Sequence, residues 1–99
     1  MSNIEVFIAE RPTLDEAQKI VGGLVQLVTI PDFEVELLPE AAKTHDWVKL
    51  HQFHNLSVQM LVNEEGLILS LPYNDEASDM VGYAILGPAI ILIGKAMWD

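Results

Sequence analysis

Residues Val62 to Tyr73 read VNEEGLILSLPY, with apolar residues on both sides of a short polar turn that ends in glycine. This pattern is typical of a β-hairpin, in which the glycine accepts the positive φ that the turn requires. Upstream, residues 56–62 place alternate apolar side chains on one face of a sheet: Leu56, Val58, Met60 and Val62. We therefore expect strands over residues 56–62 and 67–71, joined by a turn with Gly66 in the left-handed region.

The most apolar window of the chain, residues 84–93 (AILGPAIILI), is expected to pair with these strands. It holds ten residues, whereas a membrane span needs about 20, so it is interpreted as a buried strand with a bulge or break at Gly87-Pro88. This strand is apolar on both faces, and two short helices would leave one face uncovered. An exposed apolar face predicts a homodimer. The alternative is that residues 39–55 fold over it.

The N-terminal part predicts a strand, a helix and another hairpin. Residues 4–9 alternate as a strand does. Thr13-Leu14-Asp15-Glu16 forms a capping box that starts a helix over residues 13–21, and Gly22-Gly23 ends it. Residues 24–30 predict a strand that is covered on both faces or central in the sheet, and Pro31-Asp32 would turn the chain into a further strand over residues 33–38.

The middle and the C-terminal part predict less regular structure. Pro39 suits the first position of a helical turn, after which residues up to 55 are expected to be extended. A strand would group Trp47, Lys49, His51 and Phe53 on one face, while a helix would group Trp47, Leu50 and His54. Asn74 is expected to cap a short helix that ends at Gly82.

Together these elements predict one α+β domain over residues 1–99, with a mainly antiparallel sheet of about five to six strands and one or two short helices. The chain has no cysteine, which excludes a disulfide scaffold and fits a reducing compartment. No secretory signal is visible at Met1 to Ile8. We therefore expect a cytoplasmic protein with no membrane partner.

The formal net charge of −10 comes from fifteen acidic and five basic residues. This balance argues against direct binding of nucleic acid, which requires clustered lysine and arginine. It permits an acidic decoy that occupies a basic site on a host protein. The acidic residues also fit the solvated faces of strands and the caps of helices, which is the simpler interpretation.

Several short motifs follow one another in a characteristic order. Val21-Gly22-Gly23 ends a helix, Asn63-Glu64-Glu65-Gly66 follows an apolar strand, and Leu71-Pro72-Tyr73-Asn74 precedes Ala77. With the Gly-led apolar strand over residues 87–94, the chain resembles the small phage-encoded family called domain of unknown function 3846. The resemblance implies a bacteriophage or phage-derived origin, hence a host-cell cytoplasm, and treats residues 30–55 as an insertion. It implies no activity, because the family has none assigned.

No residue pattern predicts a catalytic centre, a cofactor or a metal site. His45, Asp46, His51 and His54 lie in the least regular segment, without the rigid frame that zinc requires. Neighbouring carboxylates in a tight turn, Glu64 and Glu65, point apart instead of straddling a substrate.

Residues that could contact a ligand or a partner are Asn63, Glu64, Glu65, Tyr73 and Asn74. A turn bond from Asn63 and a helix cap from Asn74 are the simpler roles for the two amides. The sequence thus predicts a non-enzymatic protein-interaction module. The alternatives are an acidic inhibitor of a host nucleic-acid-binding protein and a binder of a small polar ligand.

Overall fold

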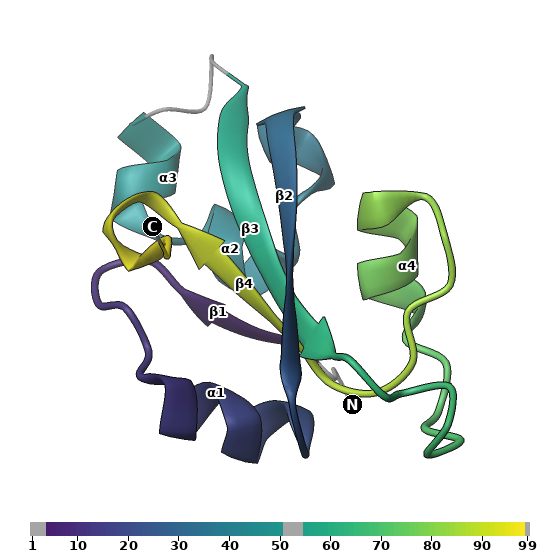
Figure 1. Ribbon diagram of the computed structural model, residues 1–99. Helices are drawn as coiled ribbons and strands as arrows, with labels where there is room; N and C mark the ends of the chain where they lie inside the picture. The colour runs from purple at the N-terminus through teal and green to yellow at the C-terminus, as the bar shows by residue number, and fades with distance from the viewer. Residues whose placement is uncertain (1–3, 51–54, 99) are drawn as a thin grey trace.

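The computed structural model describes residues 4–50 and 55–98, which form a four-stranded sheet with the order β1-β4-β3-β2. Its strands are β1 (Ile4–Phe7), β2 (Val25–Phe33), β3 (Leu56–Asn63) and β4 (Ala89–Ile93) (Figure 1). β3 is antiparallel to both β2 and β4, whereas β1 is parallel to β4. The α+β class is confirmed. The predicted mainly antiparallel sheet of five to six strands is matched in part: the described residues build a smaller sheet of four strands, in which β1 alone pairs in parallel.

Helices cover both faces of this sheet. They are α1 (Leu14–Val21), α2 (Glu40–Lys43), α3 (Asp46–Leu50) and α4 (Asp75–Val81), with 3₁₀ turns η1 (Val35–Leu37) and η2 (Gly94–Ala96). Figure 1 shows α1 on one side of the sheet and α2 on the other. No helix in residues 4–50 and 55–98 is long and apolar enough to cross a membrane.

The sheet separates two apolar cores, and β4 contributes to both. Ala89, Ile91 and Ile93 pack into the larger core. Ile90 and Leu92 pack against α1 in the smaller core. Every residue of β4 is therefore fully buried within the single chain, because successive side chains alternate between two covered faces.

The expected exposed face of the 84–93 segment is not present in β4, so the argument that led to a homodimer is wrong. Ala42 of α2 and Val48 of α3 lie in the larger core together with Ile91 and Ile93. The alternative is confirmed for the described part of that segment: residues 40–50 provide the cover. They do so as helices, and His51 and His54 fall outside the described residues.

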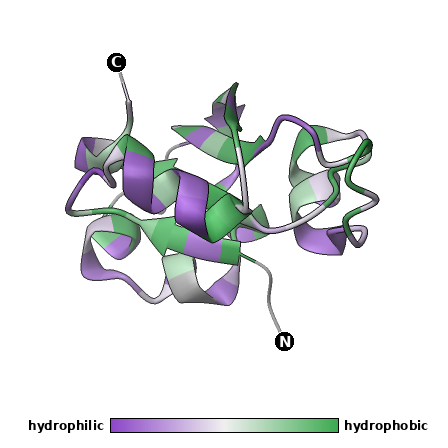
Figure 2. Cartoon of the chain, turned by 60° about the horizontal axis from the view of Figure 1, so that its bottom comes forward, coloured by the Kyte–Doolittle hydropathy of each residue, from purple (hydrophilic) through white to green (hydrophobic). Residues whose placement is uncertain are grey.

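α1 forms as its local sequence predicts. The Thr13 hydroxyl accepts a hydrogen bond from the Glu16 amide at 3.1 Å, and the Glu16 carboxylate accepts one from the Thr13 amide at 3.1 Å. Gly22 ends the helix with φ +83°, a conformation that suits glycine. Figure 2 shows the hydrophilic side of α1 turned to solvent. On the opposite side of the helix, Ala17 and Val21 are buried in the smaller core.

The predicted hairpin over residues 24–38 is wrong. β2 continues through Pro31 and Asp32 by a bulge, where Asp32 has φ +53° and the register with β3 shifts. Beyond the bulge the chain forms η1 instead of a strand. Val35 and Leu38 are buried while Leu37 is exposed, which is the three-residue period of a 3₁₀ turn and not the two-residue period of a strand.

The hairpin predicted for residues 56–71 is also wrong. Residues 56–63 form β3, but residues 64–70 form consecutive turns. Both edges of β3 are occupied by β2 and β4, so residues 67–71 have no strand to pair with there. Gly66 is absent from the residues with positive φ, so its predicted left-handed conformation is wrong as well.

Candidate functional site

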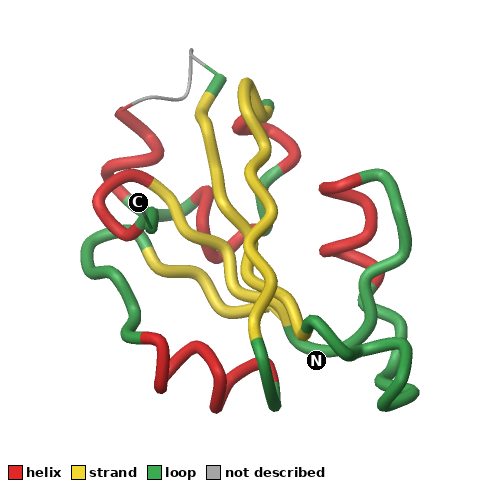
Figure 3. Tube along the Cα trace, viewed as in Figure 1, coloured by secondary structure: helices red, strands yellow, loops and turns green. Residues whose placement is uncertain are grey.

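Two loops meet at the end of the sheet where β3 finishes and β4 begins. We call residues 64–73 the first loop and residues 82–88 the second loop; α4 connects them. Figure 3 shows both in green beside this end of the sheet. The Asn74 amide donates to the Ile85 carbonyl at 2.8 Å, and the Gly87 amide donates to the Pro72 carbonyl at 2.7 Å. The two loops therefore form one paired structure.

Asn74, the N-cap residue of α4, connects the two loops. Its Oδ1 accepts from the Ala77 amide at 3.1 Å, which caps the helix as the sequence predicts. Its Nδ2 donates to the Gly87 carbonyl in the second loop at 2.8 Å. The side chain is buried, so both of its polar atoms serve the frame of the loops.

Ser78 makes a further connection that the sequence does not signal. Its buried hydroxyl accepts from the Ile85 amide at 2.8 Å and lies 3.4 Å from the Ile85 carbonyl, to which it donates. The one hint is a polar residue beside Ala77 on the inner side of α4. Such a residue is unremarkable in a short helix until its partner in another loop is known.

Asn63 fixes the start of the first loop. Its Oδ1 accepts from the Glu65 amide at 2.7 Å, which confirms the predicted turn bond. Its Nδ2 also donates to the Val21 carbonyl at the end of α1, at 3.0 Å. Because that carbonyl is distant in sequence, only the fold reveals the second bond.

Gly66 lies at a close approach of the two loops. A Cβ on this residue would stand 2.7 Å from the Leu86 carbonyl oxygen and 3.3 Å from the Leu86 Cβ. The glycine is therefore required by the space between the loops and not by its own φ. Its importance was predicted, but for a different reason.

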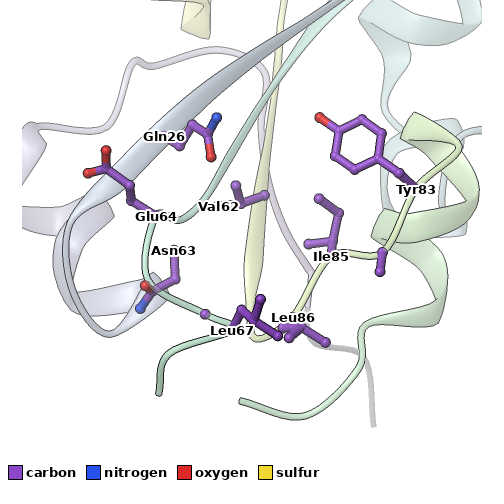
Figure 4. A pocket seen from close by; sticks show the side chains of 10 residues that line it. Gln26, Val62, Asn63, Glu64, Leu67, Tyr83, Ile85 and Leu86 are labelled. Carbon is purple, nitrogen blue, oxygen red and sulfur yellow. The ribbon is translucent and has the colours of Figure 1, made fainter. Parts of the chain in front are cut away.

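A pocket of about 240 Å³ opens between the paired loops and β2. Figure 4 shows Gln26 and Glu64 on one side and Tyr83 on the other, with Val62 and Ile85 between them. The side chain of Glu64 has no hydrogen bond or ion pair with the described residues. Gln26 and Tyr83 were missed because no local pattern marks them.

Both loops expose large apolar and aromatic side chains. In the first loop Leu67 is 81% exposed, Ile68 79% and Leu69 51%. Tyr73 and Tyr83 are each 55% exposed on the same pair of loops. We call these residues, Leu67, Ile68, Leu69, Tyr73 and Tyr83, the apolar loop surface.

The residues predicted to contact a ligand or partner divide into two groups. Asn63 and Asn74 are buried and hold the loops in place. Glu64, Glu65 and Tyr73 are exposed on the first loop, and of these Glu64 lines the pocket.

The described residues contain no group of three or more His, Asp and Glu side chains that could hold a metal. His45 uses its Nδ1 to accept from the Trp47 amide at 3.2 Å. His51 and His54 lie outside the described residues.

Comparison with known proteins identifies no relative of this chain. No protein family model, no curated protein sequence and no solved structure matches this chain. The site must therefore be interpreted from its own geometry.

Proposed function

We propose that this chain is a non-enzymatic protein-interaction module that binds its partner through the apolar loop surface. The observation that carries the proposal is the run Leu67-Ile68-Leu69. Its side chains are 51% to 81% exposed, although the chain buries other apolar residues in its two cores. Burying one such side chain stabilises a complex by about 1.5–3 kcal/mol at most. Contiguous exposed apolar residues commonly mark an interface.

The frame of the loops supports this role. Asn63, Asn74 and Ser78 hold the backbone of both loops by hydrogen bonds that are buried or partly buried. Among residues 4–50 and 55–98, no buried side-chain polar atom lacks a hydrogen-bond partner. A surface that is held in place before binding loses less conformational freedom when the partner arrives.

Charge around the surface indicates what the partner offers. Residues 50–94 contain no lysine or arginine, whereas the loops and α4 carry Glu64, Glu65, Asp75, Glu76 and Asp79. A complementary partner has an apolar groove with a basic rim. A host protein of that kind would fit the resemblance to a phage-encoded family.

The test compares two aspartate variants whose parent side chains are equally exposed. Ile68 and Leu50 are both 79% exposed, but Leu50 lies in α3, away from the loops. Tagged protein is used to capture partners from a lysate, and captured proteins are identified and rebuilt into a complex from purified components. We expect Ile68→Asp to abolish the reconstituted complex and Leu50→Asp to preserve it. Equal binding by both variants would refute the proposal.

Salt distinguishes this contact from an acidic decoy. Raising the ionic strength from about 0.1 M to 1 M shortens the Debye length from about 10 Å to 3 Å. An apolar contact survives this change. A complex that forms at low salt alone, and that includes a nucleic-acid-binding protein, would instead support the decoy.

A homodimer is a second proposal, on a surface other than the one the sequence indicated. β2 is an edge strand, and its residues 25–30 carry no charge. Leu24 and Leu27 are exposed beside this edge. Uncharged edge strands readily pair with another chain. Light scattering that gives a two-chain mass for the native protein and a one-chain mass for Leu27→Lys would support pairing; one chain in both would exclude it.

A further inference from the structure

The pocket beside the apolar loop surface has an apolar interior and a polar mouth. Val62 and Ile85 are buried at its base, and Leu86 adds a further apolar wall. Glu64, Gln26 and Tyr83 stand around this base (Figure 4). A ligand that fits such a site has an aliphatic stem and one polar end.

The size of the pocket favours a small group over a drug-sized ligand or a cofactor. The volume of about 240 Å³ is below the range of roughly 300–1,000 Å³ that is typical of small-molecule and cofactor pockets. The pocket is lined in part by the same two loops, through Leu67 and Tyr83. It therefore suits one side chain that projects from a larger molecule bound across the loops.

The charge of the ligand follows from the lining. Glu64 is the one charged residue of the pocket, and its carboxylate has no partner among the described residues. An incoming anion would be repelled, whereas a cation would gain a charge-assisted hydrogen bond. The half-exposed ring of Tyr83 offers a second attraction, since aromatic faces attract ammonium and guanidinium groups.

We infer that this pocket receives a lysine or arginine side chain of the partner, with its methylene stem on Val62 and Ile85 and its charged end at the mouth of the pocket beside Glu64. The inference rests on the proposed function, because that side chain arrives with the segment that covers the apolar loop surface. It also explains the charge pattern in chemical terms: the partner's basic rim includes one residue that enters the pocket.

The experiment uses n-butylguanidinium as the probe and isotope-labelled full-length protein observed by NMR. Pentanoate, with a similar stem and the opposite charge, and n-butanol, with the same stem and no charge, are the control probes. We expect butylguanidinium to shift the amide signals of Gln26, Glu64, Gly66 and Tyr83 in a saturable manner. The two control probes should bind at least about fivefold more weakly.

Two neighbouring carboxylates supply matched variants. Glu64→Gln keeps the shape of the side chain but removes the charge, and should weaken butylguanidinium binding about fivefold or more. Glu65→Gln removes a charge from the next residue, which is exposed and does not line the pocket, and should leave binding unchanged. Superimposable spectra of the free variants establish that each is folded.

Three results would overturn the inference: no saturable shift with butylguanidinium, equal binding of pentanoate, or equal losses in the two variants. These failures are separable from failure of the proposed function. If the pocket does not bind the cation but Ile68→Asp still abolishes the reconstituted complex, the interaction surface stands and the pocket inference falls. If the cation binds and no complex depends on Ile68, the pocket is a cation site and the proposed function falls.

Discussion

Two apolar runs of equal length have opposite positions in this molecule. Residues 89–93 read AIILI and form β4, where every side chain is fully buried. Residues 67–71 read LILSL and lie in the first loop, where Leu67 and Ile68 are almost fully exposed. The difference shows that the hydrophobicity of a segment does not by itself decide whether the segment is buried.

Competition for β3 accounts for the difference. β3 has two edges, and pairing with β2 and β4 occupies both. β4 has an uninterrupted apolar sequence and both faces covered, so its pairing removes more apolar area from water. The run over residues 67–71 is interrupted by the polar Ser70, which has φ +54°, and it remains in the loop.

The largest expected effect separates these two runs by their contribution to stability. Ile91→Ala should lower the free energy of unfolding by about 2–5 kcal/mol, because it leaves a cavity in the larger core. Ile68→Ala should change it by no more than about 0.5 kcal/mol, as a surface substitution does. Denaturant unfolding of both variants provides the measurement. Similar losses would mean that the first loop is packed against the protein in solution.

A smaller effect concerns the hydrogen bonds of Asn74, which fix the loop that carries the exposed run. Asn74→Ala removes the cap of α4 and leaves the Gly87 carbonyl without its donor, at an expected cost of about 2–3 kcal/mol. Thr13→Ala removes the exposed cap of α1 alone and should cost about 1 kcal/mol. Denaturant midpoints of the two variants measure the difference. A cost for Asn74→Ala no greater than that for Thr13→Ala would show that the loop bond contributes nothing.

The smallest expected difference between two paired variants concerns the close approach of the two loops. Gly66→Ala should cost about 1–3 kcal/mol, because the new Cβ meets the Leu86 carbonyl, which is backbone and cannot rotate away. Gly82→Ala, with φ +82° and nothing within 4 Å of the new Cβ, should cost about 1–2 kcal/mol through backbone strain alone. NMR distinguishes them: Gly66→Ala should shift the Leu86 and Gly87 amides, and Gly82→Ala should not. An undisturbed second loop in Gly66→Ala would show that the loops are further apart.

The sequence alone determined the elements that depend on neighbouring residues. The capping box at Thr13, the caps at Asn74 and Gly82, and the turn bond of Asn63 were all predicted correctly, because each joins atoms within a few residues. The alternation in residues 56–62 likewise identified β3. For the candidate site, the same local patterns placed Glu64 in a solvent-exposed turn and marked Gly66 as important.

The tertiary structure alone decided which strands pair and which residues meet. It placed β1 parallel to β4, used residues 40–50 as a cover, and left residues 67–69 exposed. It also brought Gln26 and Tyr83 to opposite sides of one pocket with Glu64. These outcomes depend on competition among segments far apart in the chain for the same edges and faces. A local pattern indicates that an apolar run is suited to burial, but it does not indicate which segment of the chain will pack over it.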